Sequence, residues 1–110
     1  MNALSELLEF GFHDAKISVI LFDFIKKSVQ VSLSVGCEEI SKSDNGYDVV
    51  YRDGKLTFTE VRSCNIDGAY DFKNPVVILE GEIDKHSCNF YLSSDQSVII
   101  KSKKVEFAWI

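Results

Sequence analysis

The 110-residue chain has little of the material from which metal centres and disulfide scaffolds are built. It has two histidines and three cysteines, and Cys37, Cys64 and Cys88 are widely spaced with no Cys-x-x-Cys pair. A secreted disulfide scaffold of this size usually has about four or more cysteines, in even number. We therefore expect reduced thiols.

Long apolar runs and a basic leader are also missing. The longest apolar runs, such as Val19 to Phe22, have the length of a strand, whereas a bilayer span needs roughly 20 apolar residues. The first nine residues carry two acids and no base, which is unlike a secretory signal. The sequence therefore predicts a cytoplasmic protein that makes no contact with a membrane.

Proline and positive charge are scarce as well. The one proline, Pro75, precedes an apolar run, where a missing N–H matters least to a strand. Lys and Arg total 12 against 17 Asp and Glu, for a net charge of −5. Binding to a phosphate backbone relies on Lys and Arg, so we expect no nucleic-acid partner. A basic partner suits this charge better.

The most regular feature that is present is the segment 28–36, in which an apolar residue occupies every second position. This is the period of a strand with one face in the core. The segment 15–22 has apolar residues on both faces, which favours a strand that is covered on both sides. Further strands are predicted, separated by short polar turns such as 102–104. Their ranges are 76–83, 88–92, 97–101 and 105–109.

Asp53-Gly54 lies between two alternating runs. This dipeptide favours a type I′ turn, because both central residues of that turn need a positive φ. The resulting register pairs Tyr51 with Leu56 and Val49 with Phe58, which puts all four side chains on one face. The sequence therefore predicts a two-residue hairpin here.

The N-terminal residues have the pattern of a short helix. Leu4, Leu7 and Leu8 form one apolar stripe, Asn2 can cap its start, and Gly11 follows its end. The predicted fold is thus mainly β (α+β), one domain over residues 1–110. It is an antiparallel meander of about seven strands, either a curved sheet or a sandwich, with one short N-terminal helix.

No catalytic or metal-binding constellation emerges. His86 and Cys88 are two positions apart and His13 is followed by Asp14, but neither pair is part of a ligand cluster or a nucleophile motif. We interpret His86 as a turn residue, Cys88 as a core residue, and the His13-Asp14 pair as partners for free backbone groups. The expectation is no catalytic residue, no metal and no cofactor.

Two segments break the strand period, 36–47 and 62–74, and the excess negative charge lies in and around them. They also contain tyrosines, and aromatic residues surrounded by acids are typical of a protein-binding surface with a charged rim. An equally open alternative is that these aromatics cover the edge of the core. The candidate partner-binding residues are Glu38, Glu39, Asp44, Tyr47, Asp67, Tyr70 and Asp71.

The layout of the chain resembles that of small bacterial immunity proteins of polymorphic toxin and contact-dependent inhibition systems. The residues that carry the resemblance are Phe12 to Ile17 and Leu56 to Val61. It implies a non-catalytic protein that binds and neutralises one cognate toxin domain, and a nuclease toxin with a basic cleft would suit the acidic residues.

Two other functions remain open. The chain could hold a small ligand in the concave face of its sheet, as an accessory domain, or it could be an enzyme that uses His13 or His86. The sequence does not distinguish a monomer from a dimer.

Overall fold

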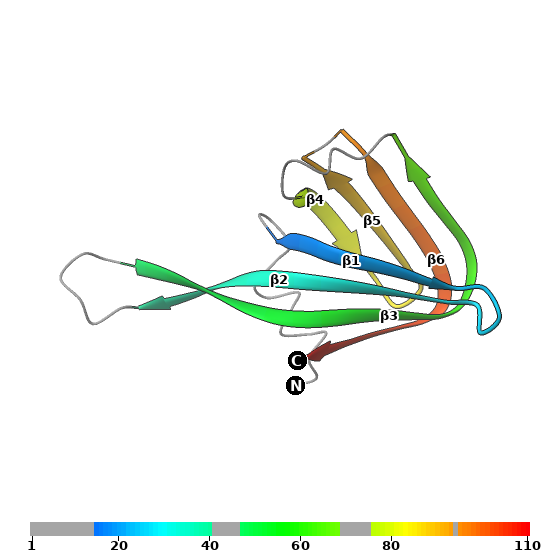
Figure 1. The fold of residues 1–110 in the computed structure, drawn as a ribbon, viewed down its shortest axis with the longest axis horizontal. Helices are drawn as coiled ribbons and strands as arrows, with labels where there is room; N and C mark the ends of the chain where they lie inside the picture. Colours follow the sequence, from blue (N-terminus) through cyan, green and yellow to red (C-terminus); the bar gives the residue numbers. More distant parts are fainter. Residues whose placement is uncertain (1–14, 41–46, 69–75, 94) are drawn as a thin grey trace.

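The computed structural model describes residues 15–40, 47–68, 76–93 and 95–110. These residues form antiparallel strands in one sheet whose order, β1-β2-β3-β6-β5-β4, closes into a barrel (Figure 1). The mainly β class is therefore confirmed, and the described residues contain no helix. The predicted N-terminal helix lies outside them. The strands are β1 (Lys16–Asp23), β2 (Ser28–Ile40), β3 (Tyr47–Asp67), β4 (Val76–Ile83), β5 (Ser87–Leu92) and β6 (Ser97–Trp109).

The predicted boundaries of β1, β4 and β5 are correct to within one residue. β2 begins at Ser28, as the alternation predicts, but it continues to Ile40 and so includes part of a segment that breaks the period. Alternation reports which face of a strand is buried, and it fades where both faces meet solvent. A strand that leaves the core therefore continues without a signal in the sequence.

The predicted hairpin at Asp53-Gly54 is wrong, because β3 runs through this dipeptide without a turn. Gly54 pairs with Leu33 on one side and with Trp109 on the other. A Cβ atom at Gly54 would lie well within van der Waals contact distance of the Phe107 ring. Glycine is thus needed here because an aromatic ring packs directly on the backbone.

The predicted turn at 102–104 is also wrong, since β6 is one strand. Its buried positions are Val98, Ile100 and Ser102, and then Val105 and Phe107. The buried face moves from even to odd positions because β6 bends there, and such a phase shift reads in the sequence as a break between two strands. The described residues therefore contain six strands, where the sequence predicted about seven.

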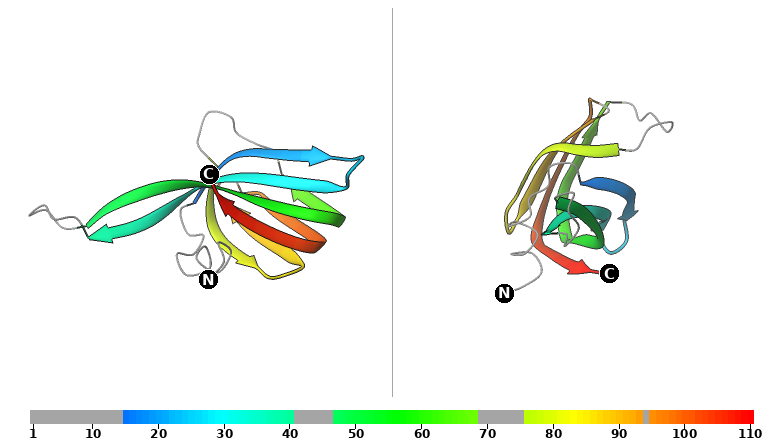
Figure 2. Two further views of the ribbon diagram at one scale, coloured as in Figure 1. Left: turned by 90° about the horizontal axis from the view of Figure 1, so that it is seen from below. Right: turned by 90° about the vertical axis from the view of Figure 1, so that its left-hand side faces the viewer.

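β3 bends beside β6. Glu60 has a positive φ of 52°, and the pairing with β6 shifts register between Val61 and Ser63. Bulges of this kind let one strand contribute to two layers. In the views of Figure 2, the first half of β6 and the second half of β3 curve away from β1 and β2 and lie in one layer with β5 and β4.

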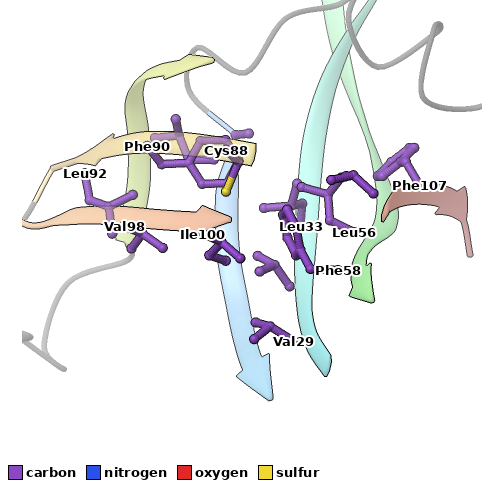
Figure 3. Close-up of a cluster of buried hydrophobic side chains, with 14 of the residues drawn as sticks. Val29, Leu33, Leu56, Phe58, Cys88, Phe90, Leu92, Val98, Ile100 and Phe107 are labelled. Carbon is purple, nitrogen blue, oxygen red and sulfur yellow. The ribbon is translucent and has the colours of Figure 1, made fainter. Parts of the chain in front are cut away.

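The interior of the barrel is filled with buried apolar side chains from β2 to β6 (Figure 3), and Ile17 and Ile20 of β1 pack against them partly buried. Val105 and Phe107 of β6 are buried in this core, and Trp109 is partly buried against it with its ring edge-on to Phe107 at 4.8 Å between centroids. The barrel closes through a short pairing of Lys16 and Ile17 with β4. The largest fully buried apolar side chains are Phe58, Phe90, Leu33, Leu56, Ile78, Leu92 and Ile100.

Candidate binding surfaces

The outer parts of β2 and β3 extend beyond the barrel as a two-stranded ribbon (Figure 1). β2 pairs with β1 only as far as Ser34, and β3 pairs with β6 only from Gly54 onward. Beyond these points the two strands pair with each other, from Gly36 opposite Tyr51 to Ile40 opposite Tyr47. We call residues 36–40 and 47–51 the β2–β3 arm.

The arm carries negative charge. It contains Glu38, Glu39 and Asp48, and no Lys or Arg occurs among its ten residues. The register sets Glu39 directly opposite Asp48. Acidic residues thus occupy directly paired positions of the arm.

The structure brings part of the predicted binding set together. Glu38, Glu39 and Tyr47 all lie on the arm, and the register adds Asp48, which the sequence analysis did not select. Asp67 lies at the opposite end of β3, where it is exposed. The three others, Asp44, Tyr70 and Asp71, lie outside the described residues.

The described cysteines and histidine are not arranged as a nucleophile and its base. Cys88 is only 1% exposed, and burial raises the pKa of its thiol to about 12. Burial also raises the pKa of Cys64, which pairs with Ile100 across β6 from Cys88. His86 is exposed in the β4–β5 turn, where its Nδ1 donates to the carbonyl oxygen of Lys103 at 2.9 Å.

These positions confirm the interpretation of Cys88 as a core residue and of His86 as a turn residue. The part of the chain that the structure describes contains no group of three or more His, Cys, Asp or Glu side chains that could hold a metal ion. Cys37 lies on the arm, and His13 and Asp14 lie outside the described residues.

A second surface, at the turn between β1 and β2, was missed by the sequence analysis. Phe24 and Ile25 at the apex are 87% and 95% exposed, and Leu21 and Phe22 on β1 are also exposed. The expectation that β1 is covered on both faces is therefore wrong. We call residues 21–27 the β1–β2 tip.

The signal for this tip was present in the sequence. Turns usually contain Gly, Pro, Asn, Asp or Ser, whereas the tip reads Phe-Asp-Phe-Ile-Lys-Lys after Leu21. Two large apolar residues at the apex of a short turn have no core to enter. Their presence therefore indicates an exposed apolar surface rather than a part of the folded core.

Comparisons with known protein families, with curated proteins and with solved structures found no match for this chain. Among the described residues, no helix is long and apolar enough to cross a membrane. A functional assignment must therefore come from the surfaces themselves.

Proposed function

We propose that this chain is a non-catalytic protein-binding module of the immunity-protein type, which neutralises a cognate toxin domain by presenting the acidic β2–β3 arm to a basic cleft. The observation that carries the proposal is the arm itself. A two-stranded ribbon outside a core is marginally stable at best. An arm that extends from the barrel into solvent is therefore explained better by a partner than by the needs of folding.

The charge of the arm indicates the chemistry of that partner. All charged residues in its described part are acids, namely Glu38, Glu39 and Asp48. A basic cleft that binds a phosphate backbone is complementary to such a surface, and complementary charge accelerates association and excludes wrong partners. A nuclease toxin would have a cleft of this kind.

The filled interior supports a protein partner over an enclosed ligand. Fifteen apolar residues of the described part of the chain occupy the core, and the largest of them are fully buried. A pocket of about 310 Å³ remains at one mouth of the barrel, between β1 and the ends of β3 and β5, and Ser18 is the one polar residue in its lining. Specific ligand sites depend on several placed polar groups, which this lining lacks.

The test compares two double charge reversals. Glu38→Lys with Glu39→Lys changes the arm, whereas Glu80→Lys with Glu82→Lys makes the same change in net charge at exposed positions of β4. The partner is the toxin-like domain encoded by the neighbouring gene, and the measurement is its association rate at several salt concentrations. We expect the arm variant to associate roughly tenfold or more slowly at low salt and to lose most of its salt dependence.

The β4 variant should associate at a rate close to that of the unchanged protein. Equal rates for the two variants would contradict a role for the arm. Asp67→Lys, measured in the same way, tests the other end of β3 separately. A neighbouring gene that encodes no toxin-like domain would remove the basis for the immunity assignment.

A further inference from the structure

The β1–β2 tip is an ordered apolar projection. Oδ1 of Asp23 accepts the backbone N–H groups of Ile25 and Lys26 at 3.1 and 2.9 Å, which fixes the turn. The rings of Phe22 and Phe24 are stacked, with their centroids 6.3 Å apart. The tip is also attached to the barrel, since the carbonyl oxygen of Lys27 accepts the N–H of Val61 at 2.8 Å. The backbone of the tip is thus fixed by hydrogen bonds, with its exposed apolar side chains directed away from the core.

Positive charge surrounds this projection. The bends of β3 and β6 and the β4–β5 turn lie at the same end of the barrel, joined by the bond from Val61 to Lys27 and by one from the N–H of Ser102 to the carbonyl oxygen of His86. In Figure 1 all of them lie at the right-hand end. The exposed charged residues described in these four segments are Lys26, Lys27, Arg62, Lys85, Lys101, Lys103 and Lys104, against Asp23, Glu60 and Asp84.

This end is therefore cationic, although the whole chain has a net charge of −5. All three acids are engaged locally: Asp23 and Asp84 accept backbone N–H groups, and Glu60 lies 3.6 Å from Lys103. Lys104 in turn pairs with Glu106 on β6. The opposite polarity lies on the β2–β3 arm, at the far end of β2 (Figure 1). A molecule with separated charges turns its cationic end toward an anionic surface.

We propose that the β1–β2 tip docks on an anionic lipid bilayer, with Phe24 and Ile25 inserted among the acyl chains and the surrounding cations at the level of the phosphates. Apolar side chains flanked by Lys are typical of segments that lie in the membrane interface. The charge of the rim provides the complementarity to anionic headgroups.

A lipid surface fits this tip better than a pocket on a protein does. Lys26 and Lys27 follow the apex directly, so a protein pocket deep enough for Ile25 would strip water from two ammonium groups. At a bilayer, the long lysine side chains reach back to the phosphates while the apex is buried. Lipid also adapts to a convex apex without a preformed cavity.

The sequence predicted no membrane contact because it contains no spanning segment. Docking at the interface needs no such segment, since its strength comes from a small buried apolar area together with charge attraction. The proposal is independent of toxin binding, which involves the other end of β2.

The experiment is co-sedimentation of the full chain with large unilamellar vesicles. One set contains equal parts of phosphatidylglycerol and phosphatidylcholine, and the other contains phosphatidylcholine alone. We expect binding to the anionic vesicles only. Phe24→Ser with Ile25→Ser should weaken it by roughly tenfold or more through lost apolar burial, and Lys26→Gln with Lys27→Gln by roughly tenfold through lost attraction.

Ile110→Ser is the matched control, because Ile110 is another isoleucine that is 81% exposed but lies at the C-terminus. It should bind like the unchanged protein. Insertion is measured separately with Phe24→Trp in a Trp109→Phe background, whose emission should shift to shorter wavelength on addition of anionic vesicles only.

Absence of sedimentation with the anionic vesicles would overturn the proposal, and so would equal loss of binding in the Ile110→Ser control. A third contrary result is self-association in analytical ultracentrifugation that the Phe24→Ser and Ile25→Ser pair abolishes, without vesicle binding. That result would assign the tip to a contact between two copies of the chain. Toxin association is also measured for the same tip variants, which distinguishes this proposal from the proposed function of the arm.

Discussion

The two hairpins that β2 forms with its neighbours differ in the charge and polarity of their residues. At one end, the β1–β2 tip is apolar and surrounded by cations; at the other end, the described part of the β2–β3 arm has only acidic charges. Between them, Val29, Val31, Leu33 and Val35 are buried in the core. One strand thus provides the support for two surfaces and keeps their charges apart.

The two ends also differ in how they are held. The tip is fixed by the carboxylate of Asp23 and by the hydrogen bond from Val61 to Lys27. The strands of the arm pair only with each other beyond Ser34 and Gly54. Under the two proposals, the tip would insert as a formed unit, whereas the arm would adjust to the surface of a partner.

The largest expected effect on stability comes from a substitution in the core, which lies between the two ends of the molecule. Phe58 is fully buried and pairs with Val29 and Val105. Phe58→Ala should lower the free energy of unfolding by about 3–5 kcal/mol, measured by urea denaturation. Tyr51→Ala on the arm is the control, and it should cost less than about 1 kcal/mol because the half-exposed ring makes a cation–π contact with Lys16. Similar losses for both variants would mean that the arm is part of the core.

The next largest effect on stability is expected at Gly54, close to the junction of the barrel and the arm. Gly54→Ala places a methyl group against the Phe107 ring, so we expect a loss of about 1–3 kcal/mol from overpacking. Phe107→Leu removes the ring, and the double variant should be less destabilised than the sum of the single variants. Strict additivity in this double-mutant cycle would contradict the proposed reason for the glycine.

The fold was predictable where a strand keeps one face in the core. The alternation of Ser28 to Val35 and the run 76–83 predicted β2 and β4 because burial imposes the period. It was not predictable at the bends, since β3 and β6 change layers there and the buried positions of β6 shift by one. The Asp53-Gly54 dipeptide gave a wrong prediction for a related reason. Its glycine is required by the packing of Phe107, which is distant in the sequence, and a local sequence pattern does not contain that contact.

The candidate surfaces were predictable in part. A composition rule selected Glu38, Glu39 and Tyr47 as acidic and aromatic residues outside the period, and they do lie on one arm. The same rule missed Phe24 and Ile25, because it treated apolar residues as scaffold. Their position at the apex of a turn is the physical sign that a core cannot hold them.

A smaller effect concerns the thiol inside the barrel. The pKa of Cys88 is raised by burial to about 12, against an ordinary value of 9.0. The unfolded chain therefore releases this proton first, so stability is fully present below about pH 9 and declines as the pH rises toward 12. Between pH 8 and 10 the loss should be about 1 kcal/mol. Cys88→Ala should remove this part of the pH dependence in urea titrations, and an unchanged slope would show that the thiol ionises in the folded barrel.

The smallest expected effect is at the tip, and it gives the sharpest contrast with the core. Phe24→Ser and Ile25→Ser each remove a large apolar side chain, as Phe58→Ala does, but these residues are 87% and 95% exposed. Their substitution should change the free energy of unfolding by less than about 0.5 kcal/mol, measured by the same urea denaturation. A loss comparable to that of Phe58→Ala would show that the tip packs against the protein in solution. An unchanged stability would mean that folding does not account for these exposed apolar side chains, as the proposal of a contact outside the chain requires.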